Sequence, residues 1–472
     1  MSLTRQIAHN TITQLIGKII STLLGLITIG LMTRYLGVEK FGWYITTIAF
    51  LQFIGIMTDF GAIVVTAQML SEPFHDKTKL FKNLFALRFF TALLFFALAP
   101  FIALFFPYPP EVKLAIIIAS LSYFTIQINQ VFVGLFQTKL KMHIYAISEV
   151  AGRIVLVLGV WLLIKIDAGF LLIIAAILAA SIIQTMIIWY KARQETAIGF
   201  DFDFKIWKDI ITKMWPIALA IIFNAVYLKG DLIFLSIYSS QADVGLYGAA
   251  YRVLDVITQS AMMIMGTLMP LLAFAWSRQQ KNEFKKYYQQ AFDIMMLFAI
   301  PMMFGAITLS KKIMQFIAGP DFAESEKILS ILAIAVFGVF LGAVFGHTAV
   351  AINRQKETLW IYISNAIITL IGYLIFIPIY GMLGAAWMSV FSELYAGILL
   401  FFTISHYSQE KINFKTTGKI IFASLIMCAA LIFVKQTHIL VSIMIGIVVY
   451  SAVILLTKGI SKKTINEILE RG

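Results

Sequence analysis

The chain has 472 residues, of which 60% carry hydrophobic side chains and only 13% are charged. This composition excludes a soluble globular protein, in which about a quarter of the residues are charged. The formal charge of +13 does not require a nucleic-acid partner, because membrane proteins collect Lys and Arg in their cytoplasmic loops. We therefore expect an all-α integral membrane protein.

Apolar segments long enough to cross a bilayer follow one another from Thr11 to Thr457. Each spanning helix needs about 20 mostly apolar residues, so the chain is predicted to hold about fourteen of them. Their continuous apolar runs favour helices over the strands of a membrane barrel, which alternate over about ten residues. The first run is too long, and too closely followed by others, for a cleaved signal peptide. The expected spans cover residues 11–34, 41–69, 83–106, 111–137, 144–165, 169–191, 210–238, 244–276, 288–311, 328–352, 358–379, 382–406, 417–435 and 438–458.

Basic residues are divided unequally between the two sides of these spans. If the N-terminus is cytoplasmic, the cytoplasmic segments hold roughly three times as many Lys and Arg residues as the external ones, which predicts that both termini lie in the cytoplasm. The external loop with Lys311 and Lys312 is the exception. The cytoplasmic stretch from Lys191 to Lys213 also carries aromatic residues and is predicted to lie on the inner leaflet as a linker. These aromatic residues are Phe200, Phe202, Phe204 and Trp207.

Two short echoes in the sequence indicate an internal repeat. Phe41-Gly42-Trp43-Tyr44 opens the second span and Val244-Gly245-Leu246-Tyr247 opens the eighth, while residues 137–149 and 353–365 cross corresponding cytoplasmic turns. An even number of spans separates each pair, so the copies share one orientation, as in transporters built from two bundles related by an axis along the membrane normal. The predicted organisation is an N-terminal six-helix lobe at 1–191, a linker at 192–209, a C-terminal six-helix lobe at 210–407, and two extra helices with a cytoplasmic tail at 408–472.

Charged residues inside the spans are the first candidates for function, because each costs about 2.5–3.5 kcal/mol to insert. Residues three or four apart share a helical face, so Glu149 is predicted to pair with Arg153, and Arg252 with Asp255. Lys18 and Lys229 have no acid on their own helical face and are predicted to be free cations in a cavity. The other ionisable residues are Arg88 and Asp293, near cytoplasmic ends where they can snorkel, and Asp59, Asp231 and Glu393, which are candidates for carrying a coupling proton or sodium ion.

Polar stripes on three spans suggest that these helices line a wet cavity. The first stripe is Gln14, Lys18, Ser21, Gly25 and Thr28; the second is Tyr123, Gln127, Gln130, Gly134 and Gln137; the third joins Asn224 and Asp231 beyond a break at Pro216. Cations and amides suit an anionic substrate rich in hydroxyl groups. We predict no catalytic residue, metal or cofactor, because Cys428 is the only cysteine and the six histidines lack the spacing of a helical ligand pair.

The turn after the first span, Arg34-Tyr35-Leu36-Gly37-Val38-Glu39-Lys40-Phe41-Gly42-Trp43-Tyr44, resembles the R-x-L-G-x-x-x-F-G-x-Y signature of the polysaccharide-biosynthesis flippases. These are the O-antigen type within the multidrug/oligosaccharidyl-lipid/polysaccharide exporter superfamily. Asp59-Phe60-Gly61 is similar to their D-x-G element. The resemblance implies two six-helix lobes in a V-shaped, alternating-access arrangement.

The resemblance also implies a function and a site. Such a protein moves an undecaprenyl-diphosphate-linked oligosaccharide, destined for O-antigen, capsule or exopolysaccharide, from the cytoplasmic to the external leaflet of the bacterial plasma membrane. Its partners are then this substrate, membrane lipids and other polysaccharide-assembly proteins. Cavity cations that match the family's diphosphate-facing role are Lys18, Arg153, Lys229 and Arg252, with Arg34 as a residue that is equally suited to an architectural role.

Three alternatives remain open at the level of sequence. A drug exporter of the same superfamily would have more cavity aromatics and unpaired acids, and a flippase for the peptidoglycan precursor would look much the same. A membrane glycosyltransferase could use Asp201 and Asp203 as a metal-binding D-x-D motif, although no catalytic domain surrounds them. No nucleotide-binding P-loop is present, so an ion gradient or removal of product would drive transport.

Overall fold

The computed structural model describes residues 3–59, 65–66, 69–70, 76–434 and 436–459; within these ranges, the side chains of 3–9, 11, 59, 216–222, 224–225 and 228 lie outside the description. Every regular element in the described residues is a helix. The chain divides into two compact units, Met1–Gly245 and Leu246–Gly472. Each unit is therefore described by itself.

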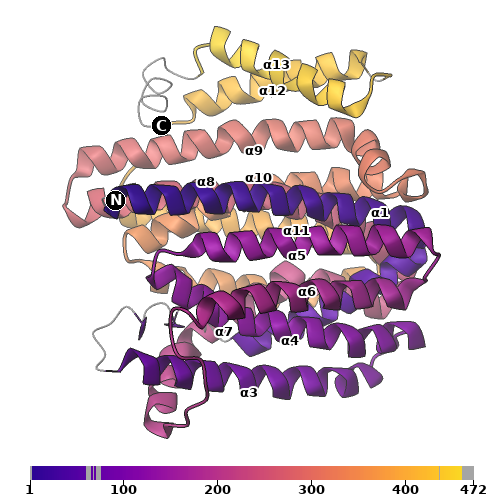
Figure 1. The fold of residues 1–472 in the computed structure, drawn as a ribbon. Coiled ribbons are helices and arrows are strands. Elements are labelled where there is room, and N and C mark those ends of the chain that lie inside the picture. The colour runs from indigo at the N-terminus through magenta and orange to yellow at the C-terminus, as the bar shows by residue number, and fades with distance from the viewer. Residues whose placement is uncertain (1–2, 60–64, 67–68, 71–75, 435, 460–472) are drawn as a thin grey trace. The chain divides into compact units, whose positions relative to one another are not determined.

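The first unit is a bundle of long helices (Figure 1). In it α1 packs against α5, α5 against α6, α6 against α4, and α4 against α3, so helices that are distant in the chain lie side by side. The helices are α1 (Leu3–Asp59), α3 (Lys77–Leu104), α4 (Pro110–Thr138), α5 (Met142–Lys165), α6 (Phe170–Ala192) and α7 (Phe204–Tyr238).

The turn inside α1 depends on the backbone freedom of one glycine. Gly37 adopts φ 67° and ψ −178°, a conformation that side chains rarely allow. The Tyr35 hydroxyl donates to Asp167 Oδ1 over 2.8 Å and accepts from the Gly169 amide over 2.9 Å, which fixes the turn against the α5–α6 connection. The Arg34 guanidinium donates to the Gly30 carbonyl oxygen over 2.9 Å. The Arg34–Gly37 motif thus forms a corner between two spans.

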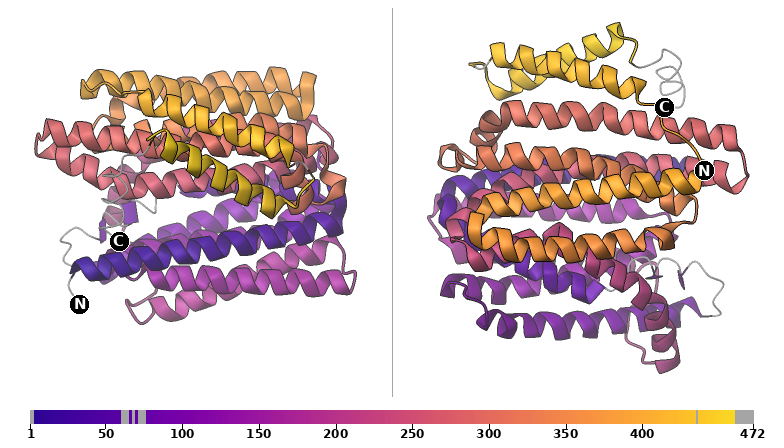
Figure 2. Two further views of the ribbon diagram at one scale, coloured as in Figure 1. Left: turned by 90° about the horizontal axis from the view of Figure 1, so that it is seen from above. Right: turned by 180° about the vertical axis from the view of Figure 1, so that it is seen from behind.

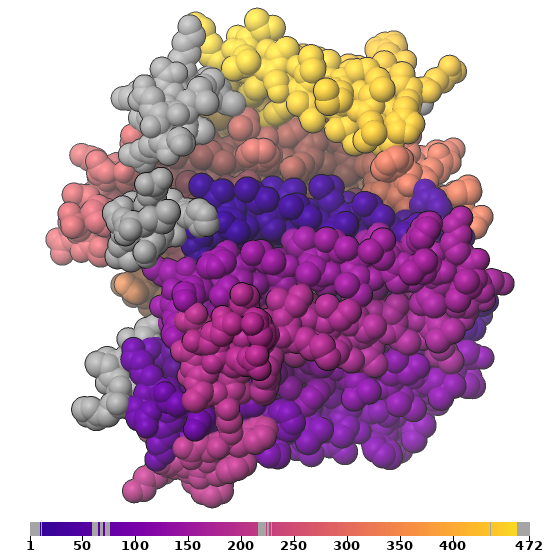
Figure 3. Space-filling view, viewed as in Figure 1, coloured from indigo at the N-terminus to yellow at the C-terminus, as the bar shows by residue number. Residues whose placement is uncertain are grey.

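The second unit is built around α10, which packs against α9 and α11. The helices α12 and α13 form a hairpin that lies on α9, as the yellow and coral segments in Figures 2 and 3 illustrate. The helices are α8 (Gln241–Ser277, whose first turn belongs to the first unit), α9 (Lys281–Ile317), α10 (Ser325–Ala351), α11 (Gln355–Ser408), α12 (Lys415–Phe433) and α13 (Ile439–Leu456), with a 3-10 turn η1 at Pro320–Phe322.

The predicted all-α membrane fold is confirmed. Eleven helices of the described chain are long and apolar enough to cross a membrane. Two of them contain two spans each, because α1 turns at Gly37 and α11 turns at Gly381, which has φ 54°. With α7 in place of the seventh expected span, the order of elements matches the predicted order. The division into lobes at 192–209 stays a prediction, and the structural units divide after α7.

Candidate functional site

A polar cavity of about 180 Å³ lies in the first unit between α4, α5 and α6. Six polar side chains line it, although all three helices are apolar enough to span a membrane. Buried polar groups in lipid need partners or a ligand. This cavity is therefore the candidate functional site of the first unit. Its polar lining comes from Asn129, Tyr145, Glu149, Arg153 and Gln184, together with Ser181.

Glu149 connects this cavity to α1. Its Oε1 lies 3.8 Å from Lys18 Nζ, and the Glu149 side chain is 17% exposed while that of Lys18 is 45% exposed. The prediction that Lys18 is a free cation was wrong, because α5 supplies an acid that spacing within α1 cannot reveal. In the described residues Glu149 forms its ion pair with Lys18, so the predicted pair with Arg153 is also wrong. Arg153 remains an exposed cation at the cavity.

Four polar residues of this cavity were missed by the sequence analysis, namely Asn129, Tyr145, Ser181 and Gln184. The sequence did contain a signal for Tyr145. On α5 it shares one helical face with Glu149, Gly152 and Arg153. Gly152 brings α5 close to α6, since a Cβ there would lie 3.2 Å from the Gln184 Cβ. The pairing of α4 with α6 could not be inferred from spacing.

Arg88 forms a second polar cluster, buried among α1, α3 and α4. It is 3% exposed, so the prediction that it snorkels to the surface was wrong. Its guanidinium donates to the Thr58 carbonyl oxygen, and to the carbonyl and side-chain oxygens of Gln127. Gln127 Nε2 donates to the Gly55 carbonyl oxygen over 2.9 Å. The Gln127 amide is therefore used within the bundle, in contrast to its predicted role toward substrate.

The remaining predicted residues are dispersed. Gln14 and Gln130 are half-buried on α1 and α4. Lys229 is half-buried and has an interaction partner, so its prediction as a free cation was wrong too. Asp231 is buried, and its carboxylate accepts from the Leu232 amide over 2.8 Å.

In the second unit, Arg252 and Asp255 form the predicted ion pair at 3.4 Å. Glu393 is half-buried and also has an interaction partner. Asp59, Asn224 and Pro216 have side chains outside the described part of the chain.

The two copies of the first echo, around Gly42 and Gly245, meet at the start of α8. A Cβ on Gly42 would lie 1.7 Å from the Gln241 carbonyl oxygen, and one on Gly245 would lie 2.1 Å from the Val38 carbonyl oxygen. The Thr46 hydroxyl donates to Gln241 Oε1 over 2.7 Å beside this crossing. Only glycine permits backbones to approach so closely. The repeat motifs are thus joined at one point in the first unit.

The segment between α6 and α7 is held on the first unit by ion pairs and rings. Asp203 caps α7, accepts from Lys79 Nζ over 2.7 Å, and receives support from Asn83, whose Oδ1 accepts from the Asp203 amide over 2.8 Å. Phe200 stacks on Phe85 of α3. Because its carboxylate is used as a cap and an ion-pair partner, Asp203 does not behave as a metal ligand, and no cluster of three potential metal-binding residues occurs in the part of the chain that was described.

Acidification is expected to release this segment. The hydrogen bond from Lys79 lowers the pKa of Asp203, and that from Lys141 lowers the pKa of Glu195. A carboxyl with a lowered pKa stabilises the docked state above its ordinary range and loses that effect as pH falls through the lowered value. Hydrogen exchange of residues 194–203, corrected for intrinsic rates, should therefore speed up from pH 7 to about pH 3.5. Glu195→Gln with Asp203→Asn, which keeps a capping side chain, should exchange fast at both values; equal pH dependence in this double variant would contradict the assignment.

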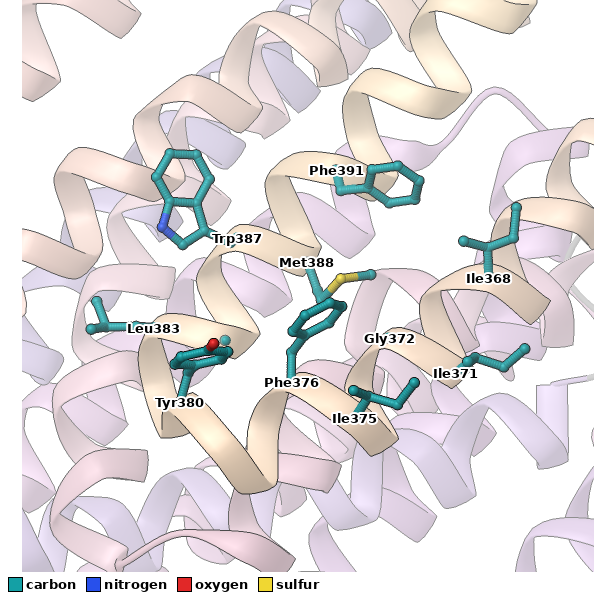
Figure 4. Close-up of a pocket in the computed structure, with 11 residues that line it drawn as sticks. Ile368, Ile371, Gly372, Ile375, Phe376, Tyr380, Leu383, Trp387, Met388 and Phe391 are labelled. Atoms are coloured by element: carbon teal, nitrogen blue, oxygen red, sulfur yellow. The ribbon is translucent and has the colours of Figure 1, made fainter.

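A larger groove, of about 760 Å³, runs along the two arms of α11 (Figure 4). It is lined by apolar side chains, among them Phe376, Trp387 and Phe391, and the arms approach each other where Met388 lies over Gly372. Such a surface suits a hydrocarbon chain and offers no partner to a charged head group. In this respect the groove differs from the cavity lined by Glu149 and Arg153, which is polar.

Comparison with known proteins agrees with this architecture. A protein of Haloferax volcanii assigned as the low-salt glycan biosynthesis flippase Agl15 is 23% identical over 246 residues, which are 51% of this chain and 52% of that protein. The chain thus matches about half the length of this relative. A Shigella flexneri protein assigned as an O-antigen transporter is 22% identical over 397 residues, covering 80% of this chain and 93% of that protein.

Solved structures with similar folds are those of membrane transporters. The lipid II flippase MurJ in an inward closed conformation gives a TM-score of 0.79 at 19% identity and covers 94% of this chain and 98% of its own. An inward-facing multidrug resistance MATE transporter of the MOP superfamily gives 0.66 at 14% identity, covering 84% and 98%. At these identities the likeness concerns the fold.

Two family profiles match the sequence itself. The MatE profile matches residues 216–380. The polysaccharide biosynthesis protein profile matches residues 7–276, which is more than half of the chain. The protein therefore belongs to the polysaccharide biosynthesis protein family.

Proposed function

We propose that this protein moves an undecaprenyl-diphosphate-linked oligosaccharide from the cytoplasmic to the external leaflet of a bacterial plasma membrane. The single observation that carries the proposal is the polar Lys18–Glu149–Arg153 region on a bundle of apolar helices. Family membership and the flippase relatives supply the class of substrate. The charge distribution of the loops supports cytoplasmic termini.

The region has the chemistry that such a passage requires. Arg153 can donate to diphosphate oxygens, and the amides of Asn129 and Gln184 can bond sugar hydroxyls. Glu149 balances Lys18 while no substrate is bound, so the two charges need not be left unpaired in a medium of low dielectric. No covalent bond changes. The protein lowers the cost of taking a hydroxylated, charged head group through a membrane while the polyprenyl chain stays in lipid.

The glycosyltransferase alternative is set aside, because the named relatives are flippases and transporters and Asp203 is engaged with Lys79. Coupling to a proton or sodium gradient, through Asp231 or Glu393 within the described chain and Asp59 outside it, stays a prediction. So does cooperation with other polysaccharide-assembly proteins.

The test is translocation in proteoliposomes of a fluorescent undecaprenyl-diphosphate oligosaccharide. Loss of one charge-assisted hydrogen bond is worth about 1.5–3 kcal/mol, so Arg153→Ala should slow transfer by about tenfold or more. Lys18→Ala should also slow it, and Lys113→Ala, which removes a half-buried lysine of the first turn of α4 that bonds the Leu104 carbonyl oxygen, should not. Wild-type rates in Arg153→Ala, or export of a cationic dye without lipid transfer, would overturn the proposal. If an unlabelled lipid-linked peptidoglycan precursor inhibits this transfer more strongly than the unlabelled lipid-linked oligosaccharide does, the substrate would be the peptidoglycan precursor.

A further inference from the structure

A second polar cavity, of about 790 Å³, lies in the second unit between the end of α9, the start of α10 and the α12–α13 turn. It includes Lys311 and Lys312, the two lysines that break the charge distribution of the loops. These residues stand at the predicted ends of spans, which is the depth of lipid head groups. The cavity is outside the region assigned to substrate.

Lys312 has a structural role in this cavity. Its ammonium donates to the carbonyl oxygens of Val434 and Thr437, over 3.1 and 2.8 Å, and to Ser442 Oγ over 2.7 Å. All three of its protons are used. Lys312 therefore ties the α12–α13 turn to α9 and is not available to a ligand.

Lys311 and His438 present donors to the same space. Lys311 lines the cavity, and within the described chain it has no hydrogen-bond or ion-pair partner. His438 Nδ1 accepts from the Leu440 amide over 3.3 Å, so the neutral ring carries its proton on Nε2, where it can donate to a ligand. The ring is held edge-on to Phe316 at 5.8 Å. Two donors thus border the cavity on α9 and on the first turn of α13.

Glu326 borders the same cavity from the first turn of α10. Its carboxylate does not pair with Lys311 in the part of the chain that the structure describes. A ligand with negative charge alone would be repelled by Glu326, whereas one with a phosphate and an ammonium group would satisfy both sides. Leu309, Leu431 and Ile439 supply an apolar floor that a free phosphate would not use.

We propose that this cavity binds the head group of a phospholipid that carries a phosphodiester and a primary ammonium, as phosphatidylethanolamine does. The phosphate lies against Lys311 and His438, the ammonium donates to Glu326, and the first methylene groups lie on the apolar floor. The lipid then bridges α9, α10 and the α12–α13 hairpin. This site is independent of the proposed transport function.

The experiment is native mass spectrometry of the full chain, released from detergent in the presence of phosphatidylethanolamine, phosphatidylglycerol, phosphatidylcholine or inorganic phosphate. The wild type should retain phosphatidylethanolamine severalfold more than the other two lipids. Lys311→Gln should lower its retention severalfold, and Glu326→Gln should remove the preference for it. Lys327 is an exposed neighbour outside the cavity, so Lys327→Gln should change neither the retention of phosphatidylethanolamine nor the preference for it.

Three results would overturn the proposal. They are equal retention of the three lipids by the wild type, unchanged retention in both Lys311→Gln and Glu326→Gln, and retention of inorganic phosphate in place of lipid. Circular dichroism of each variant establishes that the helical fold is kept, since neither substituted side chain supports another element in the described structure.

Discussion

Gly245→Ala is expected to destabilise the protein, and to do so more than Gly266→Ala in the same helix. The added Cβ would lie 2.1 Å from the Val38 carbonyl oxygen and 3.1 Å from the Gly42 amide nitrogen. Both are backbone atoms, which cannot move aside as a flexible side chain can, so one of the two helices must shift. Overpacking of this kind costs about 1–3 kcal/mol and at times more. Thermal unfolding followed by size-exclusion chromatography in detergent should give a melting temperature several degrees lower.

The matched control is Gly266→Ala in the same helix, where a Cβ meets nothing within 4 Å. The melting temperature of that variant should equal or slightly exceed that of the wild type, because alanine is a better helix former than glycine. Gly42→Ala, on the opposite side of the crossing, should behave as Gly245→Ala does. Equal melting temperatures for Gly245→Ala and Gly266→Ala would mean that the two motifs do not meet in the folded protein.

Arg88→Met is expected to destabilise the first unit strongly. It leaves the Thr58 carbonyl oxygen and Gln127 Oε1 without the guanidinium donor in a buried place, and it removes the additional bond to the Gln127 carbonyl oxygen. Each unsatisfied buried group costs about 1–3 kcal/mol, so a total loss of about 3 kcal/mol or more is expected. The measurement is the fraction of folded protein after heating, with wild type and variant compared in the same detergent.

Two further variants make this test specific. Arg88→Lys keeps the charge and loses the fork of donors, so it should recover only part of the stability. Arg193→Met removes an exposed guanidinium that stacks on Tyr190 at 4.6 Å, and it should cost about 1 kcal/mol or less. A loss for Arg88→Met no larger than that for Arg193→Met would contradict the buried cluster.

The fold was largely predictable from the sequence, because the length of apolar runs sets the number of spans. The predicted final spans 417–435 and 438–458 agree closely with α12 and α13. The two copies of the first echo, which contain Gly42 and Gly245, lie in contact, although nothing in the sequence predicted that contact. The turns at Gly37 and Gly381 are non-helical, and each joins two spans directly.

The site was predictable only in part, because spacing reports neighbours on one helix and not across helices. It found the Arg252–Asp255 pair, and it missed that α5 brings Glu149 to Lys18. It also placed Arg88 at the surface and Gln127 in a cavity, where the packing of α1, α3 and α4 buries both. An ionisable residue in an apolar span thus marks a place where helices meet before it marks a place where substrate binds.

The close approach of Gly42 and Gly245 bears on the evolutionary origin of the chain. Val38 precedes Gly42 by as many positions as Gln241 precedes Gly245. Gly42 faces the Gln241 carbonyl oxygen, and Gly245 faces the Val38 carbonyl oxygen, so the two contacts are equivalent. This reciprocity is the mark of an isologous contact, in which one surface patch faces its own equivalent. It is the contact that two identical half-length chains would make across a two-fold axis. Fusion of such halves into one polypeptide would free each copy to diverge everywhere except where it touches its twin.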